Sequence, residues 1–592
     1  MPLKRLAALG GAAALAATTL AACDSGEQEG TDDGANAAGS IEEAAAANRS
    51  RQVDERFGET PKVLADNDHS GVASSELYFE DSETAIVTGP TLAEQLRGAS
   101  IAVAAHAPVF RLSEGVESDI AAEIDRLGAG KVLLVGDADI DLGDDVETIE
   151  DPGTAEGLTS LTSLQFEERV VSDQGDIAEA VAGLDGQDPQ WIRPSWEGLP
   201  GQPAPEDEYG AGEESESAES SSPSSAESAS ASEGEPGEGS FPVQSARDGD
   251  AGPITVSHPG STIADIANAR AWGAPVRHLD FPDPRIDEDA TKAVAGLSDG
   301  PLIALGSEFG TDTSLGRAIE LAEDPGEELP GGGHLVFPGR RMIALYGHPS
   351  GGALGVMGEQ GPEESVQRVR ELISQYEQFE SEEPIIPAFE IITTIASSEP
   401  GPEGKYTNYT EAEELEPYID AVVDAGGYAV LDLQPGKASF LEQAKAYEDL
   451  LKRPNVGLAL DPEWRLEDGQ EPAAQVGHTT AAEINEVADW LAEFVYENDL
   501  PQKAFVVHQF QMQMIRDRED VNTHHPELAY VLHADGHGVP EEKYGTWHAI
   551  QEDLDPHWFL AWKNFIDEDQ PMFTPEQTYN DVSPRPWFVS YQ

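Results

Sequence analysis

The stretch Asn455-Val456-Gly457-Leu458-Ala459-Leu460-Asp461-Pro462-Glu463-Trp464 decides the fold that we expect for the C-terminal part of the chain. Its apolar run, 456–460, shows no polar alternation, which is typical of a parallel strand covered on both faces. Asp461 and Glu463 follow this run, so both side chains can point to one side at the carboxyl end of the strand. In a (β/α)8 barrel, that end carries the chemistry. The alternative is that Asp461 caps the following turn and Glu463 is solvated.

The surrounding sequence favours a barrel, because segment 331–592 alternates predicted strands and helices at the spacing of a parallel sheet. Its length is close to the roughly 250 residues of a typical TIM barrel. The predicted strands are 341–346, 385–394, 428–433, 456–460, 504–510, 529–535 and 587–592, with 546–550 or 572–574 for the remaining one. The predicted helices are 363–377, 415–425, 440–451, 482–498 and 557–566.

Polar or aromatic residues follow most of these strands. Charge buried at a barrel mouth is costly unless it serves a site, so we take these residues as candidates. The candidate catalytic carboxylates are Glu463, Asp461, Glu390 and Asp432, with Glu463 as general acid beside an indole. The candidate substrate-binding residues are His348, Trp464, His508, Gln509, Trp547 and Tyr591.

The segment 331–592 resembles the glycosidase-like (β/α) barrels of bacterial cell-envelope proteins, on the theme of Asp461-Pro462-Glu463 at a strand end. The resemblance implies carbohydrate-directed chemistry by paired carboxylates, which sugar hydrolysis requires. The chain lacks the Asp-x-x-Asp-x-Asp-x-Glu strand of chitinase-type enzymes. Two alternatives remain: a non-catalytic module that only recognises polysaccharide, or a metal-dependent hydrolase.

The metal alternative depends on His533-x-Asp535-x-His537, which places three ligand-type side chains on one face of an extended strand. Gly536 and Gly538 indicate a turn within this segment, so we predict no cofactor and keep the triad as the alternative.

The composition excludes one class of partner. The chain has 592 residues, with 113 acidic and 34 basic side chains and a net charge of −79. Duplex nucleic acid needs a basic surface, so nucleic acid is not an expected partner. Such acidity instead indicates a well-solvated exterior.

The N-terminus has the pattern of a targeting segment. Lys4 and Arg5 precede an Ala-rich apolar run that is too short for a membrane span. Then Leu20-Ala21-Ala22-Cys23 resembles the lipobox of bacterial lipoproteins, which implies cleavage after residue 22 and a lipid on the Cys23 sulfur. The chain has one cysteine, so we expect no disulfide. We therefore predict a signal peptide at 1–22, a flexible tether at 23–60 and a lipid-anchored protein on the extracytoplasmic face of the membrane.

Two further α/β units are expected, at 61–200 and 251–330. The motif "APVFRLSEGVESDIAAEIDRLGAGKVLLVGD" at 107–137 is similar to the cell wall-binding repeat 2 family, and the order of elements recurs in the second unit. The alternative is a generic parallel α/β domain. In the first unit we predict strands at 84–89, 101–104, 108–112 and 131–136. Between the units, the Ser/Glu-rich segment 201–250 is predicted to be a disordered linker. The resemblance implies cell-wall polysaccharide or peptidoglycan as partner.

Replacing Cys23 with Ser removes the only sulfur that can carry the predicted lipid. We expect the Cys23→Ser protein to move from the membrane fraction to the soluble extracytoplasmic fraction, which immunoblotting of fractionated cells measures. A variant that stays in the membrane fraction would rule out the lipobox interpretation.

Overall fold

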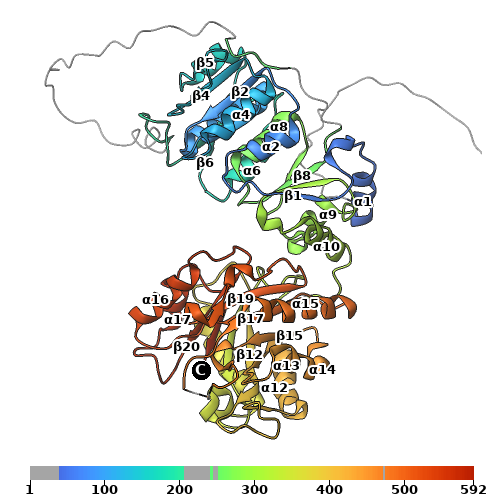
Figure 1. Ribbon diagram of the computed structural model, residues 1–592, viewed down its shortest axis with the longest axis vertical. Helices are drawn as coiled ribbons and strands as arrows, with labels where there is room; N and C mark the ends of the chain where they lie inside the picture. The colour runs from blue at the N-terminus through green and yellow to red at the C-terminus, as the bar shows by residue number, and fades with distance from the viewer. Residues whose placement is uncertain (1–38, 206–239, 245–250, 471, 473) are drawn as a thin grey trace, which may run out of the picture. The chain divides into compact units, whose positions relative to one another are not determined.

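The computed structural model describes residues 39–205, 240–244, 251–470, 472 and 474–592. The predicted signal peptide, residues 23–38 of the predicted tether and most of the Ser/Glu-rich linker lie outside these residues. Residues 39–60 of the predicted tether are described, and 41–49 form a helix rather than a flexible segment. Within them, the chain forms parallel α/β layers followed by a barrel (Figure 1). The predicted α/β class is confirmed. No helix of the described ranges has the length and apolar character needed to cross a membrane.

The N-terminal region contains two four-stranded parallel sheets and one two-stranded sheet. The first sheet has the order β3 (Val109–Arg111), β2 (Thr84–Thr88), β4 (Lys131–Val135) and β5 (Glu147–Glu150). The second has the order β1 (Lys62–Leu64), β10 (Leu302–Leu305), β8 (Ile254–Ser257) and β9 (Val276–His278). The pair is β6 (Glu167–Val171) with β7 (Gln190–Pro194).

The helices of this region are α1 (Ile41–Arg49), α2 (Val72–Tyr78), α3 (Leu92–Ala105), α4 (Glu117–Leu127), α5 (Ala155–Thr162), α6 (Ile177–Ala182), α8 (Ile263–Trp272), α9 (Glu288–Val294) and α10 (Asp312–Glu323). Asn268 of α8, the helix between β8 and β9, contacts the first sheet and the loop before α2. Its side-chain oxygen accepts from the Val109 amide of β3 at 2.7 Å, and its Nδ2 donates to the Gly71 carbonyl at 3.0 Å. The strand predicted at 101–104 is wrong. Those residues lie in α3, which is buried almost all round, so its apolar positions show no helical periodicity.

The C-terminal region is a closed barrel of eight parallel strands, which confirms the predicted fold. In barrel order the strands are β11 (Arg341–Gly347), β12 (Ile385–Ala396), β14 (Tyr428–Leu433), β15 (Val456–Leu460), β17 (Lys503–His508), β19 (Leu528–Ala534), β20 (Phe559–Asn564) and β21 (Phe588–Tyr591). Pairing of β11 with both β12 and β21 closes the ring. The strand β13 (Thr407–Tyr409) pairs antiparallel to the end of β12, and β16 (Thr479–Thr480) pairs with β18 (Ile515–Arg516).

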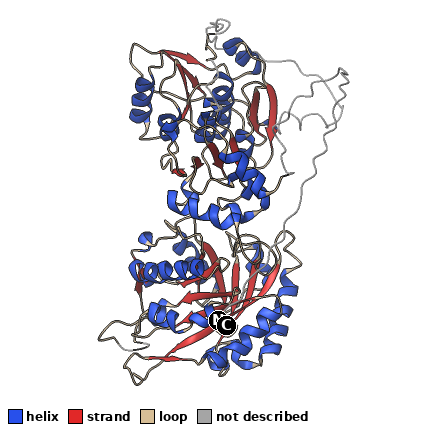
Figure 2. Ribbon diagram, turned by 90° about the vertical axis from the view of Figure 1, so that its right-hand side faces the viewer, coloured by secondary structure: helices blue, strands red, loops and turns tan. Residues whose placement is uncertain are grey.

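Helices surround the barrel strands (Figure 2). They are α11 (Pro362–Tyr376), α12 (Ala412–Asp424), α13 (Phe440–Ala446), α14 (Glu448–Leu451), α15 (Ala481–Glu497), α16 (Pro540–Gln551) and α17 (Pro575–Asn580). Their apolar faces pack on the outward side chains of the strands, such as Leu431, Leu458 and Val507, in one large core.

The seventh strand was placed wrongly from the sequence. It is β20, within the segment 557–566 predicted as a helix, whereas 546–550 lies in α16 and 572–574 is a loop before α17. Apolar residues fill β20 and its flanks densely enough to fit either a helix or a strand period. In the structure, side chains of this segment alternate between two faces, as in a strand. Ala561 lies in the core inside the barrel, while Leu560 and Trp562 pack in the core between the barrel and its helices.

Two packed layers therefore line each strand, and their alternation fixes which residues enter the barrel. The interior layer contains Ala344, Ala388, Val430, Ala459, Val506, Val531, Ala561 and Phe588, among others. Every one of these residues is at most 1 % exposed. The next inward position along each strand, two residues later, builds the site described below.

The absence of a side chain at Gly457 of β15 lets a neighbouring side chain pack closely inside the barrel. The Tyr428 ring on β14 reaches past Gly457, and its hydroxyl accepts a hydrogen bond from the Ala504 amide of β17 at 3.2 Å. A β-carbon at Gly457 would lie 2.6 Å from the Ala504 carbonyl oxygen and 3.1 Å from the Tyr428 ring. The missing side chain at position 457 therefore lets Tyr428 join two strands across a third.

Gly457→Ala should lower the free energy of unfolding of the barrel by about 1–3 kcal/mol, because a buried backbone carbonyl cannot yield to the new methyl group. The matched control is Gly545→Ala at an exposed position of α16, where nothing lies within 4 Å of the added carbon and helix propensity favours Ala. Thermal midpoints followed by circular dichroism should therefore move in opposite directions. A Gly457→Ala protein as stable as the wild type would contradict the packing described here.

Candidate active site in the barrel mouth

Each of the eight strands places one polar side chain at its next inward position, near the carboxyl end of seven strands and in the middle of the long β12, where Glu390 pairs with Tyr346. These residues, named here the polar ring, are Tyr346, Glu390, Asp432, Asp461, His508, His533, Lys563 and Ser590. Each is at most 3 % exposed. Hydrogen bonds between strands that are not neighbours, such as Glu390 of β12 with His508 of β17, show that the side chains meet inside the barrel.

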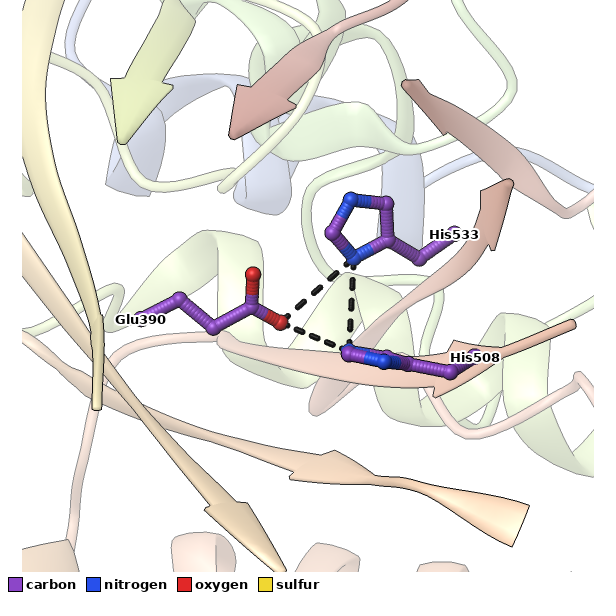
Figure 3. Close-up of side chains that lie close together, drawn as sticks. All are labelled: Glu390, His508 and His533. Carbon is purple, nitrogen blue, oxygen red and sulfur yellow. Dashed lines mark hydrogen bonds and ion pairs between the residues drawn. The ribbon is translucent and has the colours of Figure 1, made fainter. Parts of the chain in front are cut away.

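His508 lies between two carboxylates, and Figure 3 shows its contacts with Glu390 and His533. Its Nε2 is 2.7 Å from Glu390 Oε1, and its Nδ1 is 2.9 Å from Asp535 Oδ2. Burial lowers the pKa of His508, but the two carboxylates outweigh burial and hold it well above its ordinary value. With carboxylates on both ring nitrogens, the imidazolium form of His508 can donate to both.

His533 lies beside His508 on the neighbouring strand, with its ring nearly perpendicular (Figure 3). Its Nδ1 is 3.3 Å from His508 Nε2 and 3.4 Å from Glu390 Oε1, and its Nε2 is 3.0 Å from Ser590 Oγ. Burial lowers the pKa of His533, so this imidazole is neutral. For Glu390, burial raises the pKa, but His533 and His508 outweigh it and the pKa lies well below its ordinary value.

Asp432 and Asp461 form a second group in the ring. Each offers a carboxylate oxygen, and these oxygens and a ring nitrogen of His508 all lie within 4.8 Å of one another. Tyr346 donates its hydroxyl to Asp432 Oδ2 at 2.8 Å, and Lys563 Nζ lies 3.4 Å from the centre of the Tyr346 ring. Burial raises the pKa of Asp432 to about 6 and that of Asp461 well above its ordinary value.

Glu463 lies in the short 3-10 turn Pro462–Trp464 that follows β15. Asp461 caps this turn, since its Oδ1 accepts from the Glu463 amide at 3.1 Å. Glu463 is partly exposed, unlike the fully buried Glu390 and Asp432. Burial, and then the charge of Asp535, raise its pKa to about 7. Glu463 is therefore a carboxylic acid that holds its proton near neutral pH and that a ligand can reach.

The mouth holds more acidic than basic groups. The polar ring together with Glu463 and Asp535 contains five carboxyl groups, Glu390, Asp432, Asp461, Glu463 and Asp535, and only Lys563 and His508 as cations. Glu390 Oε2, Asp432 Oδ1 and Asp535 Oδ1 are buried side-chain oxygens without a hydrogen-bond partner. Buried carboxylates in this state require protons, a cation or a ligand.

Some predicted site residues lie outside the ring. His348 follows β11 and contacts Ser350 Oγ and Thr410 Oγ1 of the loops, at 2.8 and 2.9 Å. Gln509 accepts from Arg518 Nη1 at 2.9 Å and holds the loop after β17. Both side chains stabilise loops near the mouth. Trp464 is half-buried beside Glu463, where we expected it.

Trp547 and Tyr591 cannot offer a face to a sugar. Trp547 is fully buried in α16 against Trp562, and its Nε1 donates to the Ser583 carbonyl at 2.8 Å. Tyr591 points outward from β21, where its hydroxyl meets that of Tyr376 at 2.6 Å. Strand alternation explains the error for Tyr591, because its neighbour Ser590 is the inward residue.

The metal triad kept as an alternative, His533, Asp535 and His537, is not assembled. His533 and Asp535 lie on different sides of His508, and His537 is exposed with its ring against Phe565. The chain turns after β19, and Gly538 has a φ of +147°. The extended geometry that the spacing argument needs therefore ends before His537.

Tyr346, Lys563 and Ser590 are site residues that the sequence analysis missed. Lys563 was missed because β20 was taken for a helix. The inward alternation of each strand, counted from its apolar residues, would have identified Tyr346 and Ser590.

Comparison of the chain with known proteins gives no match, either to a protein-family model or to a curated protein. The functional argument therefore depends on the site itself.

The raised pKa of Glu463 predicts a pH-dependent effect on stability. Between the unfolded value of about 4.5 and the folded value of about 7, the folded protein keeps a proton that the unfolded chain loses. This contribution is fully present at pH 4 and is lost as the pH rises to 8. Glu463→Gln cannot ionise, so its thermal midpoint relative to wild type should rise by a few degrees between pH 5 and pH 8. The exposed control Asp468→Asn should show no such trend. A constant difference between Glu463→Gln and wild type would contradict the buried-acid assignment.

Proposed function

We propose that the barrel is a glycoside hydrolase-like domain that acts on envelope polysaccharide by general acid catalysis. The proposal is carried by one observation, the close pair of Asp432 and Asp461 beside the partly exposed acid Glu463. These groups lie at the carboxyl ends of adjacent strands, which is where (β/α)8 enzymes place their catalytic residues.

Asp432 and Asp461 are close enough to act as one unit. Their oxygens lie within 4.8 Å of each other. Two carboxyl groups at this separation in a buried site cannot both ionise freely, so they hold a proton between them.

The roles follow from burial and protonation. Glu463 donates a proton to the leaving oxygen, because it is protonated near pH 7 and reachable from solvent. Asp461 and Asp432 hold one proton between them, and the carboxylate that is left ionised is the nucleophile or base. Glu390 does not serve as the acid, since its low pKa and its bond to His508 keep it ionised. It acts as a positioning residue.

The location of this activity is proposed from the sequence. The lipobox at Leu20-Ala21-Ala22-Cys23 supports attachment to the extracytoplasmic face of the membrane. The similarity of the N-terminal units to cell wall-binding repeats supports contact with cell-wall polysaccharide or peptidoglycan. In this arrangement the N-terminal region holds the barrel near its polymer substrate.

The test is release of reducing ends from purified peptidoglycan and from envelope polysaccharide. Glu463→Gln should lower kcat by about 10²–10⁴-fold, which is the range of a lost general acid, with its fold retained by circular dichroism. The loss should be much smaller on an aryl glycoside of the cleaved sugar, because such a leaving group needs no proton.

The control is Asp468→Asn, an exposed carboxylate five positions after Glu463, which should keep full activity. Full turnover by Glu463→Gln would refute the assigned role. Binding of polysaccharide by wild-type protein without any turnover would show instead that the barrel is a recognition module.

A further inference from the structure

We propose that Glu390, His508 and His533 bind one divalent transition-metal ion inside the barrel mouth. The three side chains come from β12, β17 and β19, and all three are fully buried (Figure 3). This set shares only His533 with the His-x-Asp-x-His motif of the sequence. The inference does not rest on the proposed hydrolytic activity.

The distances within the set match a coordination sphere. Glu390 Oε1, His508 Nε2 and His533 Nδ1 form a triangle with edges of 2.7, 3.3 and 3.4 Å. A single point above this triangle can lie about 2.0–2.1 Å from all three atoms, which is the bond length of Zn²⁺ to nitrogen and carboxylate ligands. The side chains therefore need little movement to hold an ion.

The outer contacts of the two histidines are those of metal ligands. Metal-bound histidines almost always donate their second ring nitrogen to a carboxylate or another polar group. His508 Nδ1 lies 2.9 Å from Asp535 Oδ2, and His533 Nε2 lies 3.0 Å from Ser590 Oγ. With protons on these outer nitrogens, both inner nitrogens present lone pairs to the same point.

That point needs a positive charge. Three lone-pair atoms within 3.4 Å of one another repel unless a proton or a cation lies among them. When the proton of His533 lies on Nε2, toward Ser590, one proton on His508 Nε2 serves Glu390 but leaves His533 Nδ1 without a donor. Glu390 Oε2 is also buried and unpartnered, and it faces no other donor among the described residues. A metal ion at this point satisfies Glu390 Oε1, His508 Nε2 and His533 Nδ1 at once.

The ligand types select the ion. Two imidazoles and one carboxylate suit Zn²⁺ or Fe²⁺ and are too nitrogen-rich for Ca²⁺ or Mg²⁺. Three protein ligands leave coordination positions open, as in catalytic rather than structural sites. Asp432 and Asp461, whose oxygens lie within 4.8 Å of a His508 nitrogen, are the nearest further acceptors.

The test is metal analysis of full-length protein purified without chelator. We expect about one Zn or Fe per chain by plasma mass spectrometry. After removal by chelator, Zn²⁺ should raise the thermal midpoint of the wild-type protein by several degrees, with Fe²⁺ and Mn²⁺ as comparison probes. Glu390→Gln and His533→Asn should lose both the metal and the thermal response.

Two controls separate this site from its neighbours. His537→Ala should bind one equivalent of metal, whereas Ser590→Ala should bind it about 10–100-fold more weakly, since only an outer partner is lost. Cobalt substitution gives a reading that needs no variant. Co²⁺ in a site of nitrogen and oxygen ligands shows visible d–d bands, and no thiolate band is expected.

Several results would overturn the inference. Wild-type protein that neither contains metal nor responds to Zn²⁺ would show that protons alone fill the site. Equal metal uptake by Glu390→Gln and wild type would show only loose binding to the acidic surface. Loss of metal in His537→Ala would favour the other histidine set. Stoichiometric metal in a protein without hydrolytic activity would contradict the proposed function and leave the metal site standing.

Discussion

The imidazole of His508, held between Glu390 and Asp535, is the interaction on which the barrel mouth depends. It joins three strands that are not all neighbours and places a positive charge amid buried carboxylates. Removing one partner of such a buried pair typically costs about 3–5 kcal/mol, because the remaining charge is left without compensation. The same contact keeps Glu390 ionised and so separates its role from that of the protonated Glu463.

The acid–base groups and the metal ligands share this mouth without sharing residues. Asp432, Asp461 and Glu463 come from adjacent strands on one side of His508, and Glu390 and His533 complete the other group. A metal ion acts as a Lewis acid or lowers the pKa of a bound water, and both effects strengthen in a buried site. Its presence would change which carboxylates need protons. Turnover therefore tests the proposed hydrolytic activity, and metal content separately tests the proposed metal site.

The sequence predicted the barrel well because its strongest signal is local. Continuous apolar runs such as 456–460, ending in polar residues, identified seven of the eight strands and four members of the polar ring as candidate site residues, Glu390, Asp432, Asp461 and His508, with His533 in the metal alternative. Lys563 was lost with β20, whose composition fits both helix and strand periods. The prediction that Trp547 and Tyr591 bind substrate was wrong for another reason. Residue type indicates neither how deeply a side chain is buried nor which face of its strand or helix it lies on. The contact of His508 with Glu390 spans 118 positions and depends on barrel closure, which no local pattern encodes.

The bond from the Ala504 amide to the Tyr428 hydroxyl, over Gly457, has a consequence for ligand recognition. It lies in the interior layer below Asp461 and joins the strands on either side of β15, so the closed barrel holds that strand in place. The conformational entropy of ordering the polar groups is then lost during folding rather than during binding. A ligand meets a preorganised surface, and differences in selectivity between variants should arise mainly from the loops after the strands. The polar residues on the strands are therefore the fixed part of the site, and the loops after the strands are the part that substitutions can vary.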